Sequence, residues 1–108
     1  MFKITSKINN KWIGSMFTED NLDRDSNKVI FLIREGKLDE AEAQAKQLLI
    51  DYPEVNDGYD RLAMVYEKRG DRAKAVEMYK KALDFILNDD GYEEETRAYY
   101  REKIIELS

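Results

Sequence analysis

The sequence predicts an all-α fold, a short right-handed helical solenoid. Residues repeat at a period of 34, with Gly36 matching Gly70, Ala41 matching Ala75 and Leu49 matching Leu83. The chain of 108 residues contains one Pro and five Gly, which leaves long stretches without helix breakers. Apolar residues in these stretches recur three and four positions apart, as on one face of a helix. A helical unit of this period cannot bury its apolar face alone, so it must stack on a neighbour.

Residues 1–21 are expected to form an N-terminal extension. A spacing of four among its apolar residues suggests an amphipathic helix, and alternating apolar residues at its start fit a strand equally, while Asn9, Asn10 and Gly14 interrupt both patterns. Its large apolar side chains either cover the open end of the first repeat or form an exposed patch for a partner. The residues at a spacing of four are Ile4, Ile8, Trp12 and Met16.

Residues 22–55 are expected to form a divergent first repeat. Val29, Leu32 and Ile33 share one face of its first helix, which ends at Gly36. The second helix is predicted from about Leu38 to Tyr52. Pro53 ends it, because Pro lacks a donor N–H and disfavours a helical residue before it.

Residues 56–89 form the better-matched second repeat. Its first helix ends in Lys68 and Arg69 followed by Gly70, with cations in the last turn and glycine just beyond. Asp71 is placed to cap the next helix. The apolar face of that helix consists of Ala75, Val76, Tyr79, Ala82, Leu83 and Ile86.

Residues 91–108 are expected to form a C-terminal capping helix, running from Tyr92 to Leu107. Acidic residues gather at its start, as the helix dipole favours. Charged residues further along give it the polar outer face that the last helix of a solenoid requires for solubility.

The second repeat resembles the tetratricopeptide repeat (TPR) family. The family pattern of aromatic, Leu, small residue, Tyr, turn Gly, Ala, aromatic and Ala is matched by Tyr59, Leu62, Ala63, Tyr66, Gly70, Ala75, Tyr79 and Ala82. The closing Pro is replaced by Leu87. The first repeat keeps Gly36, Ala41 and Pro53, and departs from the pattern at Asp25, Lys28, Ala45 and Leu48. The resemblance implies two TPR-like helix pairs followed by the capping helix.

Composition narrows the classes of function. A formal charge of −5 argues against nucleic-acid binding, which usually needs a basic face. Apolar runs fall short of the ~18 residues that span a membrane, and the start of the chain lacks the apolar block of a secretory signal. The absence of Cys fits a cytoplasmic protein. We therefore expect no nucleic-acid and no membrane partner.

The sequence offers little for catalysis. With no His and no Cys, it lacks the usual catalytic triads and zinc sites. The glycine-rich phosphate loops are also absent. Asp23 and Asp25 imitate the opening of a calcium loop, but Lys28 and Arg34 occupy the places of its Gly and bidentate Glu. The expectation is a protein that is not an enzyme and binds neither cofactor nor metal.

The resemblance to TPR proteins implies a non-catalytic protein–protein interaction module, or adaptor. The first helices of successive TPR units line a concave face that holds a peptide segment or helix of a partner. Carried over to this chain, the peptide-binding residues are Asn27, Ile30, Ile33, Asp57, Asp60, Arg61, Met64, Glu67 and Lys68. The alternative that this face is filled by the N-terminal segment or the last helix stays open.

A second hypothesis is a self-assembling structural or adaptor subunit. In that case the chain would form a homodimer through apolar residues near either end. The candidates for this contact are Trp12, Met16 and Phe17 at one end and the Tyr99–Tyr100 edge at the other.

Overall fold

The computed structural model describes residues 21–87, 89 and 91–108, so the interpretations of the N-terminal extension up to residue 20 lie outside it. Across the described residues the chain is all-α, as the sequence predicted. The helices are α1 (Asn21–Arg34), α2 (Leu38–Asp51), α3 (Asp57–Arg69), α4 (Arg72–Ile86) and α5 (Glu94–Leu107). The last begins two residues later than expected, since Tyr92 belongs to the turn before it.

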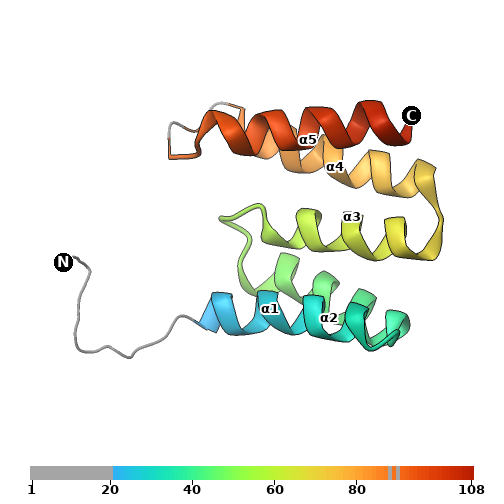
Figure 1. The fold of residues 1–108 in the computed structure, drawn as a ribbon. Coiled ribbons are helices and arrows are strands. Elements are labelled where there is room, and N and C mark those ends of the chain that lie inside the picture. Colours follow the sequence, from blue (N-terminus) through green and yellow to red (C-terminus); the bar gives the residue numbers. More distant parts are fainter. Residues whose placement is uncertain (1–20, 88, 90) are drawn as a thin grey trace.

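The five helices stack in chain order, each antiparallel to the one before it (Figure 1). Each helix packs against the next, and α1 also packs against α3. As a result α1, α3 and α5 run in the same direction, and α2 and α4 run in the opposite one (Figure 1).

The two turn glycines end their helices in the same way. Gly36 and Gly70 have φ of 75° and 82°, the left-handed region that glycine adopts at low cost. In each turn the next N–H bonds back into the helix, from Lys37 to Leu32 O and from Asp71 to Tyr66 O, both at 2.9 Å. These matched turns explain the 34-residue period of the sequence.

The second turn leads into the capped start of α4. The Asp71 carboxylate accepts a hydrogen bond from the Lys74 N–H at 3.1 Å, which confirms the predicted cap. Between the two units α2 ends at Asp51, two residues before Pro53.

The core consists of two clusters that meet at α3. Small residues sit where helices come closest, and Ala41, Ala45, Ala63, Ala75 and Ala82 are all fully buried. The first cluster joins α1, α2 and α3 through Val29, Leu32, Ile33, Leu48, Leu62 and Val65. The second joins α3, α4 and α5 through Tyr79, Ile86 and Tyr100.

Gly58, which has no part in the sequence argument, sets the distance between α2 and α3. It is buried in the first turn of α3, and a Cβ placed there would lie 2.5 Å from Leu49 Cδ2 and 3.1 Å from Leu49 N. The second distance involves backbone, which cannot move aside as a side-chain end can. Glycine is therefore required for the contact between the two helix pairs.

Candidate functional site

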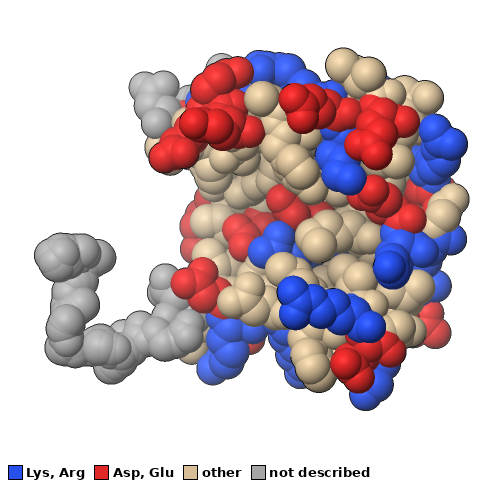
Figure 2. Space-filling view, viewed as in Figure 1, with Lys and Arg blue, Asp and Glu red and all other residues tan. Residues whose placement is uncertain are grey.

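All nine residues predicted to bind a peptide lie on α1 or α3, the two helices expected to carry them. Helix α5 lies on the same side, since its side chains reach α3 directly: Lys103 Nζ is 2.8 Å from Glu67 Oε2. We call the surface formed by these three helices the α1–α3–α5 face. It is the face turned toward the viewer in Figure 2, where uncharged side chains lie among side chains of both charges.

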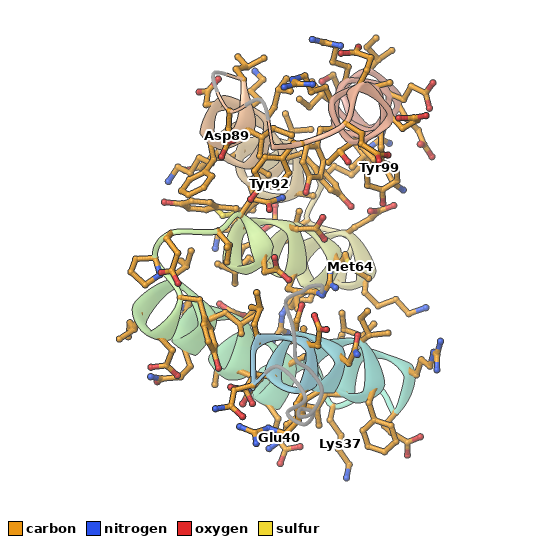
Figure 3. The ribbon with its side chains drawn as sticks, turned by 90° about the vertical axis from the view of Figure 1, so that its left-hand side faces the viewer. Lys37, Glu40, Met64, Asp89, Tyr92 and Tyr99 are labelled. Carbon is orange, nitrogen blue, oxygen red and sulfur yellow. The ribbon has the colours of Figure 1, made fainter. Side chains whose placement is uncertain are left out.

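A depression of about 340 Å³ lies on the α1–α3–α5 face, and we call it the groove. Four of the nine predicted residues line it, namely Ile33, Met64, Glu67 and Lys68, and they are joined by Tyr79, Tyr99 and Lys103. Met64 on α3 and Tyr99 on α5 extend from the same side of the molecule (Figure 3). The groove therefore has an apolar centre with three charged groups around it.

The acidic group of the groove is already bonded within the protein. Glu67 accepts hydrogen bonds from Tyr79 Oη at 2.9 Å and from Lys103 Nζ at 2.8 Å. The bond to Glu67 raises the pKa of Lys103, so this side chain stays cationic through the neutral range. Lys68 is exposed on the rim. A ligand in the groove would therefore contact apolar walls, with basic side chains at the rim.

Three other predicted residues have a different role, because they bond to one another and to neighbouring helices. Arg61 donates to Asp60 at 2.8 Å and to the Ser26 carbonyl of α1 at 3.3 Å. The Ser26 hydroxyl donates to Asp57 at 2.8 Å. The side chains of Arg61 and Asp60 are each 18% exposed. They fasten α1 to α3 and leave little surface for a partner.

The same set of bonds continues to α5 through a buried tyrosine. Tyr100 donates to Asp60 at 2.6 Å and accepts a hydrogen bond from Asn56. Burial, together with the nearby Asp60 carboxylate, raises the pKa of Tyr100 well above its usual range. We call this set the interhelix network: Ser26, Asn56, Asp57, Asp60, Arg61 and Tyr100.

The remaining two predicted residues lie on α1 at the edge of this arrangement. Asn27 is exposed and Ile30 is half-buried, and neither lines the groove. The predicted peptide-binding set did not include Tyr99 or Lys103, because the sequence assigned α5 to capping and Tyr99 to a possible dimer contact. The signal was present, since these two residues follow Met64 and Lys68 by 35 positions, one more than the period of the repeat.

A larger depression, about 430 Å³, lies on the outer side of α1 and α2. Four of the six residues along its walls are polar or charged; the six are Lys28, Leu32, Glu40, Ala43, Gln44 and Gln47. Binding sites usually combine an apolar centre with a few polar groups. The residues that line the larger depression therefore count against it as a binding site, despite its larger volume. The groove fits that description better.

The structure also bears on the predicted dimer edge at α5. Tyr100 is 1% exposed, so it offers no surface to a second copy of the chain. Tyr99 is 44% exposed and Ile105 is 76% exposed. The other predicted contact, through Trp12, Met16 and Phe17, lies outside the described residues.

Two further observations limit the chemistry of the described part of the chain. It contains no cluster of three or more acidic residues arranged to hold a metal ion. None of its helices combines the length and the apolar character needed to cross a membrane.

Comparisons with protein-family models, with curated proteins and with solved structures return no match for this chain. The likeness to TPR proteins therefore rests on the residues of the repeat and on the helix order alone.

Proposed function

We propose that the protein is a TPR-like solenoid acting as a non-catalytic interaction module, and that it binds a peptide segment or helix of a partner in the groove. The observation that carries this proposal is the groove itself. It combines Ile33, Met64 and Tyr99, one each from the parallel helices α1, α3 and α5, into one apolar strip. Lys68 and Lys103 lie beside this strip. Apolar strips bordered by charge are typical of surfaces that bind amphipathic peptides.

The chemistry of the walls indicates what kind of peptide fits. Met64 is unbranched and adapts its shape to different apolar partners, and the half-exposed ring of Tyr99 presents a large contact surface. Because Glu67 is bonded to Lys103, Lys68 is the charged side chain of the described groove lining that remains available to a ligand. The favoured ligand has apolar anchors with a carboxylate next to them. A groove of this length supports weak to moderate affinity.

The test is to select peptides from a displayed random library against the full chain and to measure their affinity by calorimetry. Met64→Lys and Lys68→Glu are the groove variants. We expect each to weaken binding about tenfold or more, which corresponds to about 1.4 kcal/mol. Arg61 is unsuitable as a test position, because changing it would break the interhelix network.

Two matched variants serve as controls. Ile105→Lys places a lysine on an exposed apolar site outside the groove, and Lys80→Glu reverses an exposed charge on α4. Both should bind the selected peptides as the unchanged protein does. Equal affinity in groove and control variants would move the binding surface elsewhere.

A further inference from the structure

The charges of the chain are divided unevenly between its N-terminal segment and its helices. Residues 1–18 contain Lys3, Lys7 and Lys11 and no acidic residue. Residues 1–20 contain three lysines and two acidic residues and so carry a formal charge of +1. Because the whole chain carries −5, residues 21–108 carry −6. A basic segment is thus joined to an acidic domain.

The junction lies at the acidic end of the α1–α3–α5 face. Because these three helices run in the same direction, their first turns lie at one end of the molecule, and α1 begins there at Asn21 (Figure 1). Acidic residues occupy the first turn of each helix: Asp23 in α1, Asp57 and Asp60 in α3, and Glu94 and Glu95 in α5.

Part of this acidic charge is balanced within the fold. Asp60 is paired with Arg61, and Glu94 lies near Arg97 and Arg101. By contrast, Asp57 accepts a hydrogen bond from the neutral Ser26 hydroxyl, and Glu95 is exposed. Figure 2 shows acidic side chains gathered over the start of α5. This end of the face attracts cations.

The pattern of the segment matches the face in two respects. The spacing of four places Ile4, Ile8 and Trp12 in one row of a helix, and Lys3, Lys7 and Lys11 in the adjacent row. The groove likewise has an apolar strip, and the exposed Glu95 lies one helical turn before Tyr99 of that strip on α5. An apolar row would meet the strip while the lysine row meets Glu95.

The length of the connection permits this contact. Ile33 lies 12 residues along α1 from Asn21, which is about 18 Å at 1.5 Å per residue. Trp12 precedes Asn21 by nine residues, which span up to about 30 Å when extended. Trp12 can therefore reach the groove of its own chain.

We propose that residues 1–18 bind in the groove of their own chain and occupy it until an external peptide displaces them. The proposal uses the groove of the proposed function and rests on its capacity to accept an apolar peptide. Residues 1–18 offer no carboxylate to Lys68, so an external peptide that carries one can displace them. The outer side of α1 and α2 is the competing location, and its walls of Lys28, Glu40, Gln44 and Gln47 are less suited to Trp12 than are Met64 and Tyr99.

Trp12 is the single tryptophan of the chain, so its fluorescence reports the location of the segment directly. The experiment uses the full chain and measures Trp12 emission and its quenching by acrylamide. We expect a shielded Trp12 in the unchanged protein. Met64→Lys or Tyr99→Lys should shift its emission to longer wavelength and increase the quenching, and Lys7→Glu combined with Lys11→Glu should do the same. The control Ile105→Lys should change neither.

Three outcomes would overturn the proposal. The first is an exposed Trp12 in the unchanged protein. The second is a shielded Trp12 that responds to Ala43→Lys on the outer side of α2 but not to the groove variants. The third is emission that changes on dilution, which would show binding between copies. Circular dichroism confirms that each variant is folded, and its peptide affinity is measured separately. Loss of peptide binding in Met64→Lys with an exposed Trp12 throughout would therefore reject this inference while leaving the proposed function intact.

Discussion

At the scale of single residues, the interhelix network shows how polar side chains fix the relative positions of α1, α3 and α5. Tyr100 is the central member, because its one hydroxyl contacts both Asn56 and Asp60 inside the protein. A buried polar group without a partner costs about 1–3 kcal/mol. The network therefore favours one arrangement of the three helices, and the groove depends on that arrangement.

We expect the stability of the protein to fall above pH 10 because of Tyr100. The pKa of Tyr100 is raised in the fold by burial, and in the unfolded chain the phenol ionises near pH 10. The stabilisation that Tyr100 provides is fully present below about pH 10. It is lost as the pH rises further, because the unfolded chain then releases the phenol proton while the folded chain keeps it. The free energy of unfolding should fall by up to about 1.4 kcal/mol per pH unit for such a tyrosine.

Thermal or urea unfolding checks this expectation when it is measured from about pH 8 to about pH 11, which brackets the ordinary pKa of tyrosine. Tyr100→Phe should be less stable at neutral pH, by about 1–3 kcal/mol, because Asn56 and Asp60 lose a partner. Its further loss above pH 10 should be smaller than that of the unchanged protein. Parallel curves for the two proteins would show that Tyr100 does not keep its proton in the fold.

At the scale of the helices, the contact between α2 and α3 is the joint between the two helix pairs. Gly58→Ala tests it. Although alanine favours a helix by about 1 kcal/mol, the added methyl would collide with Leu49, and overpacking costs about 1–3 kcal/mol. We expect a net loss of stability in a urea titration. As a control, Ala73→Gly at an exposed position of α4 measures the helix preference of alanine over glycine without a packing contact. A Gly58→Ala protein more stable than the unchanged protein would contradict the close approach of α2 and α3 at Gly58.

The helices themselves were largely predictable from the sequence, because their signals are local. The turn at Gly70, the cap at Asp71 and the stop before Pro53 each depend on neighbouring residues, and the structure shows all three. The start of α5 was predicted two residues early, because the acidic stretch after Tyr92 contains no strong cap.

The candidate site was less predictable, because it depends on contacts between helices. Arg61 and Asp60 are residue types typical of binding surfaces, and only their hydrogen bonds to Ser26 on α1 and to Tyr100 on α5 show that they bond internally. In the same way Tyr99 joins the groove because α5 lies beside α3. The repeat period alone did not reveal this extension of the face.

At the scale of the whole molecule, the stacked helices create an asymmetry between two sides. The α1–α3–α5 face holds the groove with its apolar strip and basic rim, whereas the larger depression outside α1 and α2 is lined mainly by polar and charged residue types. The parallel direction of α1, α3 and α5 also gathers their acidic first turns at one end. Both proposals follow from this asymmetry, one for an external peptide and one for the N-terminal segment.

The central claim is that the groove on the α1–α3–α5 face is the binding surface. The most direct measurement is to titrate the isotope-labelled full chain with a library-selected peptide and to map the changes in backbone amide NMR shifts. We expect the largest changes to fall on residues of the groove, around Ile33, Met64, Lys68, Tyr99 and Lys103. Changes concentrated on the outer side of α1 and α2, or on α4 away from the groove, would contradict it.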